Sequence, residues 1–113
     1  TCAISGMRLV SNRDAQMIDA CHIVPFAESQ DDTISNGLSL CPNLHRAFDR
    51  HLISISPDYE VIVSEHFIEE SVDYSIRKYH GRKILLPTET NYLPSTHNLA
   101  WHHERFWHHT RFR

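Results

Sequence analysis

The chain has 113 residues, of which 41% are hydrophobic and 22% are charged, and such values are typical of one folded domain with a modest core. The formal net charge of −3 argues weakly against tight, independent binding to nucleic acid, although it is compatible with a local basic face. Three cysteines without a Cys-x-x-Cys pair, no signal peptide and no bilayer-spanning apolar run argue against a secreted disulfide scaffold or a membrane protein. We therefore expect a cytoplasmic domain.

The first half of the chain predicts two short strands followed by a helix. Residues 14–22 form the first strand, which Pro25 ends, and a polar loop of about a dozen residues then leads to an Asn-Gly pair. Residues 38–41 form a second strand in which apolar and polar side chains alternate. Pro42 suits the first turn of the next helix because its missing N–H needs no partner there.

The second half predicts a hairpin and two helices. Residues 52–55 and 59–63 are β-rich runs on either side of a Ser-Pro-Asp turn. A helix is expected over residues 67–80 with Gly81 as its cap, followed by the extended segment "KILLP". The last stretch predicts a helix with apolar anchors at Leu99, Trp101, Phe106 and Trp107. This order of elements is that of an α+β fold.

A candidate site arises where the first strand faces the first helix. Two antiparallel strands backed by that helix would bring His22, at the end of the first strand, over the helix face that carries His45 and Asp49. Those two residues are four apart and therefore share one face. A nitrogen donor and an oxygen donor on one face, with a free histidine opposite, are typical of a hydrolytic site that uses one metal ion.

The segments "HIVP", "NGLSLC", "LHRAFD" and "LISI" resemble those of the HNH endonucleases, which have the ββα-metal fold. The chain is most similar to the branch found in bacterial restriction and defence nucleases, strongly over its first half and by general pattern over its second. The resemblance implies a single HNH nuclease domain over residues 1–113, with a ββα-metal core at about 14–51 and a C-terminal extension at about 52–113. Because the chain begins in mid-pattern, we expect a domain cut from a longer protein.

The resemblance also implies a role for each residue of the motif. His22 matches the general base that activates water, and Asn36 matches the asparagine that braces the loop and so orients this base. His45 matches a ligand of the divalent metal, and Asp49 is the candidate second ligand, with an ion pair to Arg46 or Arg50 as the alternative. We assign nucleic-acid binding to these two arginines.

The chain departs from the family pattern at its cysteines. Cys21 stands where many HNH domains carry an aspartate or histidine metal ligand, and we interpret it as a buried thiol, with a ligand role left open. Cys2 and Cys41 are followed at Cys-x-x-Cys spacing by Ser5 and Leu44, so we predict no structural zinc. The expected cofactor is a divalent metal, Mg²⁺ in the first place, for which Mn²⁺ or Ni²⁺ can substitute.

The resulting hypothesis is metal-dependent hydrolysis of DNA phosphodiester bonds by the cleavage module of a restriction or defence protein. A fused specificity or sensor domain would select the DNA, and cutting of both strands would require a homodimer. One alternative is a non-catalytic nucleic-acid-binding module on a decayed HNH scaffold. Another is a structural metal domain that mediates assembly.

The remaining histidines carry weaker signals. We interpret His51, His66 and His80 as surface residues without partners. The histidines of the final helix lie on more than one face, and a polar face around the aromatic anchors is the favoured interpretation. The alternative is that His102 or His103, together with Arg105, contacts phosphate or supports the active site.

Overall fold

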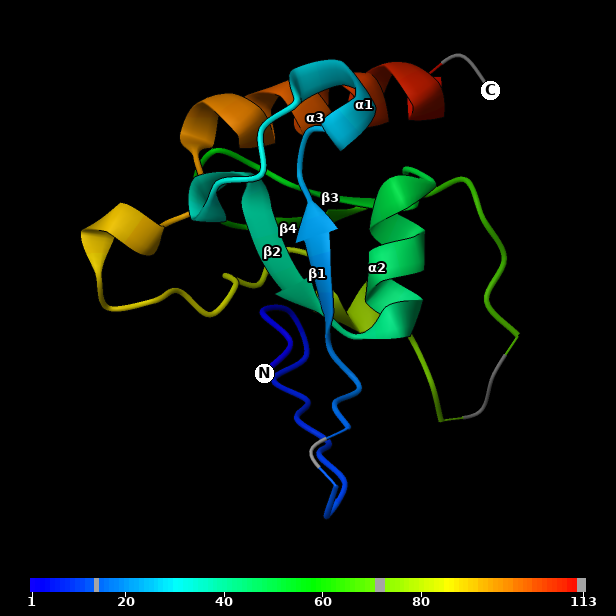
Figure 1. Cartoon of the computed structure of the whole chain (residues 1–113). Coiled ribbons are helices and arrows are strands. Elements are labelled where there is room, and N and C mark those ends of the chain that lie inside the picture. The colour runs from blue at the N-terminus through cyan, green and yellow to red at the C-terminus, as the bar shows by residue number, and fades with distance from the viewer. Residues whose placement is uncertain (14, 71–72, 112–113) are drawn as a thin grey trace.

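The computed structural model of the protein describes residues 1–13, 15–70 and 73–111, with residues 110 and 111 described by their backbone alone. The elements form a mixed α+β domain with two antiparallel hairpins and a C-terminal helix (Figure 1). Their bounds are β1 (Asp19–His22), α1 (Phe26–Ser29), β2 (Gly37–Leu40), α2 (Pro42–Asp49), β3 (Ile53–Ile55), β4 (Val61–Val63) and α3 (Thr96–Arg111). Within the described residues, no helix is long and apolar enough to cross a membrane.

The first hairpin and α2 form the strand–strand–helix unit that the sequence predicts. Strands β1 and β2 pair antiparallel, with Asp19 opposite Leu40 and His22 opposite Gly37. Pro42 occupies the first turn of α2 as expected, and α2 packs against both strands. Strand β1 is shorter than the predicted run of residues 14–22, because the chain before it forms only an isolated bridge.

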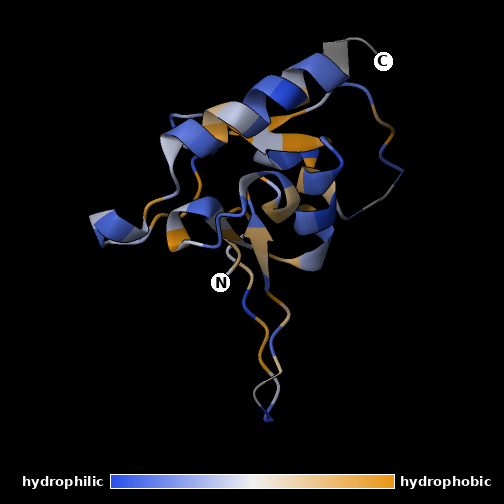
Figure 2. Ribbon diagram, turned by 45° about the horizontal axis from the view of Figure 1, so that its top comes forward, coloured by the Kyte–Doolittle hydropathy of each residue, from blue (hydrophilic) through white to orange (hydrophobic). Residues whose placement is uncertain are grey.

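The second hairpin and α3 supply much of the hydrophobic core. Strands β3 and β4 pair antiparallel, and all of β3 is buried between α2 on one side and α3 on the other. Figure 2 shows this contrast, with hydrophobic strands lying beneath a largely hydrophilic α3. These elements bury Ile53, Ile55, Val61 and Leu99, which belong to the same core cluster as Leu40 of β2 and Leu44 and Phe48 of α2.

The helix predicted over residues 67–80 is wrong. Within residues 67–70 and 73–80, the structure contains only the 3-10 turn Arg77–Tyr79. The carboxylate of Glu69 accepts hydrogen bonds from the Ile76 N–H (2.6 Å) and the Ser75 hydroxyl (3.1 Å). Arg77 lies over the Phe67 ring and also donates to the Phe67 carbonyl. These local side-chain bonds compete with helical backbone bonds. Among the described residues after the second hairpin, α3 is the one α-helix.

Candidate metal centre and its surroundings

Strand β1 and helix α2 face each other through four side chains that can bind a metal. Asp19 and Cys21 are two residues apart on β1 and therefore lie on one face of the strand. His45 projects from α2 between two carboxylates. Its Nδ1 lies 2.9 Å from Oδ2 of Asp19, and its Nε2 lies 3.2 Å from Oδ2 of Asp49.

Three of these residues form a group with the spacing of a metal site. The donor atoms of Cys21, His45 and Asp49 all lie within 4.8 Å of one another. Cys21 is 1% exposed, and its Sγ donates a weak hydrogen bond to Oδ1 of Asp49 at 3.9 Å. Burial, with the negative charges of Asp49 and Asp19, raises the pKa of the Cys21 thiol far above its usual value. The sulfur is therefore a neutral thiol here, and it would have to lose its proton to become a ligand.

The structure thus brings the two predicted ligands His45 and Asp49 together. Cys21 is buried, as expected of a core thiol, and also belongs to the donor group. A cavity of about 430 Å³ opens beside this group, and both Arg46 and Arg50 line it. Among the ion pairs described, Asp49 pairs with His45 and with neither arginine, so both guanidinium groups remain available to an anion in the cavity.

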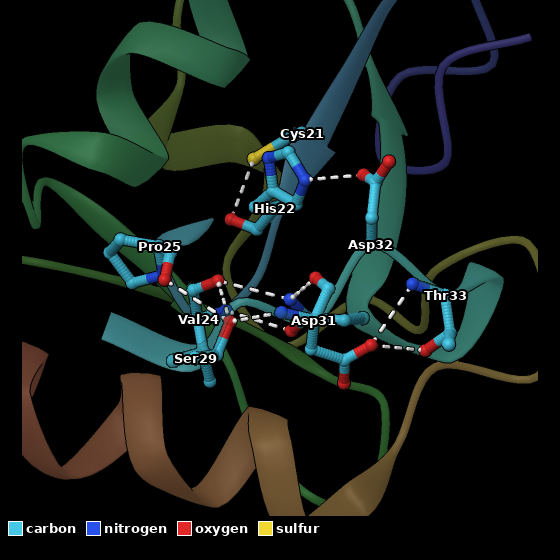
Figure 3. A network of polar contacts seen from close by, with 9 residues as sticks. Cys21, His22, Val24, Pro25, Ser29, Asp31, Asp32 and Thr33 are labelled. Atoms are coloured by element: carbon cyan, nitrogen blue, oxygen red, sulfur yellow. Dashed lines mark hydrogen bonds and ion pairs between the residues drawn. The ribbon is translucent and has the colours of Figure 1, made fainter. Parts of the chain in front are cut away.

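His22 lies in different surroundings. It follows Cys21 in β1, so strand alternation directs its side chain to the opposite face. Its Nε2 lies 2.8 Å from Oδ1 of Asp32 (Figure 3). The centroid of the Phe26 ring lies 5.8 Å from that of His22. His22 and Asp32 line a groove of about 760 Å³ whose other walls include Leu85 and neighbouring apolar residues. His22 therefore lines one hollow, whereas His45 and Asp49 of α2 line another.

Asn36 is fully buried and ties the loop after α1 to the end of β1. Its Oδ1 accepts from the Val24 N–H (3.0 Å), and its Nδ2 donates to the carbonyls of Val24 (3.0 Å) and Asp31 (2.8 Å). Its own carbonyl accepts from the Ile23 N–H at 2.9 Å. A side chain with these bonds is suited to the loop-bracing role that the sequence motif implies.

Two carboxylates of this region are absent from the sequence prediction. Asp19 could have been found, because it shares a strand face with Cys21 and so must point toward α2. Asp32 had no such signal, because it lies in a loop whose path depends on tertiary hydrogen bonds. Asp19 contacts a predicted metal ligand and Asp32 contacts the predicted base, so each can orient an imidazole.

His102 also differs from the favoured sequence interpretation, which placed it on a polar face. It is 3% exposed and stacks on Phe48 with ring centroids 3.6 Å apart. Its Nε2 donates to the Phe48 carbonyl (2.9 Å), and its Nδ1 accepts from the Ser54 hydroxyl (2.7 Å). Burial lowers the pKa of His102 to about 3. A side chain so enclosed cannot contact phosphate, and it instead fixes the end of α2.

Two further histidines have contacts that the sequence interpretation missed. His51 is half-buried, and its ring centroid lies 5.1 Å from that of His102. Nδ1 of His80 accepts a hydrogen bond from the Val63 N–H at 3.0 Å. His51 is therefore part of the packing, whereas His80 is exposed as expected and differs from the interpretation only in having a backbone partner.

Comparison with known proteins agrees with this architecture. Residues 2–56, just under half of the chain, match the family model described as HNH endonuclease. The match includes β1, β2 and α2 and implies that these elements form a ββα-metal core. It also suggests nuclease activity with a divalent metal.

A solved structure shares the fold over nearly the whole chain. It is described as a modification-dependent TagI restriction endonuclease, with a TM-score of 0.65 and 19% sequence identity. The match covers 92% of this chain and 32% of the TagI chain, so the present chain spans about a third of that protein. No curated protein sequence matches this chain.

Proposed function

We propose that this chain is the DNA-cleavage module of a restriction or defence protein and hydrolyses phosphodiester bonds with one divalent metal. The observation that carries the proposal is the group of Cys21, His45 and Asp49 at the heart of an HNH core. The likeness to a restriction endonuclease three times as long supports a setting in which another domain selects the DNA. A fused specificity or sensor domain would then be the natural partner.

His45 and Asp49 hold the ion in this proposal, and Cys21 joins them when the ion is able to displace the thiol proton. Asp19 accepts a hydrogen bond from Nδ1–H of His45, which fixes the ring so that Nε2 faces the ion. Mg²⁺ is the first ion to test, and the nitrogen and sulfur donors also suit Mn²⁺ or Ni²⁺. Bound there, a divalent ion supplies positive charge to the phosphate oxygens.

The other residues bind and activate the reactants. Neutral His22 takes the proton of the attacking water, a role typically worth about 10²- to 10⁴-fold in rate. Asn36 keeps the loop beside His22 in place through its three side-chain hydrogen bonds. Arg46 and Arg50 bind phosphates, because they line the cavity next to the metal ligands.

A second candidate function is a DNA-binding module without catalysis. One observation favours it. The His22 side chain lines a different hollow from His45 and Asp49, the proposed metal ligands. A decayed nuclease would keep the fold and the two arginines but would not cleave.

Plasmid cleavage separates the two functions. Wild-type protein, His22→Ala, His45→Ala and the control His66→Ala are each incubated with supercoiled DNA in Mg²⁺, Mn²⁺, Ni²⁺ or EDTA. His66 is exposed and far in sequence from the site, so His66→Ala should match wild type. We expect metal-dependent cleavage that EDTA, His22→Ala and His45→Ala abolish, with each variant shown to be folded by circular dichroism.

The products carry further information. Nicked circles indicate one site acting alone, whereas direct linearisation indicates a homodimer. Wild-type protein that binds the plasmid yet cleaves with none of the ions would support the non-catalytic module. Chelation that unfolds the protein would instead support a structural metal domain.

A further inference from the structure

We propose that Asp32 is a positioning residue that fixes the tautomer and orientation of His22, so that His22 accepts the proton of water through Nδ1. This inference rests on the proposed role of His22 as general base. It adds a residue that the sequence motif does not contain, and it assigns a separate task to each nitrogen of the ring.

The contact itself sets the tautomer. Oδ1 of Asp32 lies 2.8 Å from Nε2 of His22, which is a normal hydrogen-bond distance. An ionised carboxylate can only accept hydrogen bonds, so a neutral His22 carries its proton on Nε2. The lone pair of the ring then lies on Nδ1, which is directed away from Asp32 in Figure 3. The same division between an orienting carboxylate and a proton-accepting nitrogen occurs in Ser-His-Asp triads.

The loop that carries Asp32 is held on both sides. Before it, the Asp31 N–H donates to the Ser29 hydroxyl at 3.1 Å, and the Asp31 carbonyl accepts from Nδ2 of Asn36 at 2.8 Å. After it, the Asp31 carboxylate accepts from the N–H (2.9 Å) and the hydroxyl (2.6 Å) of Thr33. Both neighbours of Asp32 are therefore fixed by hydrogen bonds, and Asn36 links this loop to the end of β1.

Because the ion pair of His22 and Asp32 is exposed, it adds little to the stability of the fold, but it can still orient the His22 ring. The side chains of His22 and Asp32 are 39% and 80% exposed, and ion pairs of this kind add little to folding. Catalysis depends instead on the fraction of time that Nδ1 is unprotonated and correctly aimed. The fixed loop holds the carboxylate in place and Phe26 packs beside the ring, and both contacts restrict the orientation of the His22 ring in the folded protein.

The test uses the full chain with Asp32→Ala, Asp32→Asn and Asp32→Glu, and with Glu28→Gln as the matched control. Glu28 lies in the adjacent short helix, so Glu28→Gln removes one negative charge from the same region without touching His22. Two readouts are taken: the single-turnover cleavage rate at saturating DNA, and the tautomer of His22 by ¹⁵N NMR of histidine-labelled, metal-free protein. His22→Ala identifies the His22 signals.

We expect the Nε2–H tautomer in wild type, Asp32→Glu and Glu28→Gln. Asp32→Ala should give a mixture of tautomers, with cleavage slower by about 10- to 100-fold, part of the general-base effect. Asp32→Asn can donate its amide N–H to Nε2 and so favour the wrong tautomer, which should slow cleavage at least as much. DNA affinity should change no more than it does in Glu28→Gln.

Several outcomes would overturn the proposal. If Asp32→Ala cleaves within twofold of the wild-type rate while His22→Ala is inactive, Asp32 has no role in the mechanism. The proposed function is then unaffected. Slow cleavage by Asp32→Ala with an unchanged tautomer also contradicts a role through His22. Wild-type protein that does not cleave overturns the proposed function and this role together, even where the NMR spectrum verifies the tautomer.

Discussion

The two hairpins share a topology and differ in what holds them. The β3–β4 hairpin buries every residue of β3 and lies between α2 and α3, so apolar burial stabilises it. The β1–β2 hairpin carries Asp19, Cys21 and His22 on one short strand, and its connecting loop is fixed by the side chain of Asn36. Helix α2 contacts both hairpins. One hairpin therefore supports α2, and the other presents polar groups beside it.

This division predicts that substitutions should separate stability from chemistry. Removing an apolar side chain near β3 should lower the free energy of unfolding and leave the metal donors unchanged. Removing a polar side chain near β1 should affect the local geometry of the site more than the global stability. The following predictions test that contrast in order of decreasing size.

The largest effect is expected at the contact between α3 and β3. Leu99 is fully buried in the core, so Leu99→Ala should lower the free energy of unfolding by about 2–5 kcal/mol. Urea unfolding measures this loss. The control Ile68→Ala removes an 82% exposed side chain and should change stability by about 0.5 kcal/mol or less. Equal losses in the two variants would contradict a hairpin stabilised by burial.

Asn36→Ala should have a smaller effect on stability and a specific effect on the loop. It leaves the Val24 N–H and the carbonyls of Val24 and Asp31 without their partner, at a cost of about 1–3 kcal/mol. Hydrogen exchange should rise at residues 23–36 and remain unchanged in β3. Asn12→Ala, at an exposed position, is the control. Hydrogen exchange that rises equally in both hairpins would contradict the prediction that Asn36 acts on the loop of the first hairpin alone.

His102 makes the stability of the apolar region depend on pH. Its pKa is about 3 in the folded protein and about 6.5 when unfolded, so the unfolded chain binds the proton first. Stability should therefore be full above pH 6.5 and should fall toward pH 3, by at most about 1.4 kcal/mol per pH unit from this group. Thermal unfolding of His102→Gln should show a flatter profile between pH 6.5 and 4. Parallel profiles would contradict a buried neutral histidine.

The smallest effect is expected at the rim of the cavity beside His45 and Asp49. Arg46→Ala and Arg50→Ala should each weaken DNA binding by a few-fold and lower the slope of log Kd against log salt by about 0.9. Fluorescence anisotropy at several salt concentrations gives both values. Arg8→Ala, an exposed arginine outside the cavity, should leave the slope unchanged. Identical slopes for all three variants would remove the arginines from the phosphate contacts.

Local sequence signals were sufficient for the strand–strand–helix unit. Pro42 at the first turn, the alternation in residues 38–41 and the four-residue spacing of His45 and Asp49 all depend on neighbours in sequence. The prediction of a helix over residues 67–80 was wrong because it, too, considered only neighbours in sequence. Its pattern took no account of Glu69, whose carboxylate binds backbone and side-chain groups six and seven residues away.

The remaining parts of the site depend on contacts between distant segments. Asp32 reaches His22 only because Asn36 closes the loop between them, and no periodicity encodes that closure. His102 lies 54 residues from Phe48, and its polar side chain gave no sign that it is buried. Asp19 alone was accessible to reasoning from strand alternation, given the placement of Cys21.

The hydrogen bond from His102 to the Phe48 carbonyl determines which part of the chain would have to be kept when this domain is fused to another protein. The acceptor lies one residue before Asp49, so α3 holds the helix that carries both proposed metal ligands. A minimal unit cut at residue 56, where the family match ends, would lose this bond and would expose the face of β3 that α3 covers. A domain fused to another protein should therefore include α3, because residues 2–56 alone would lack the helix that packs on β3 and binds the end of α2.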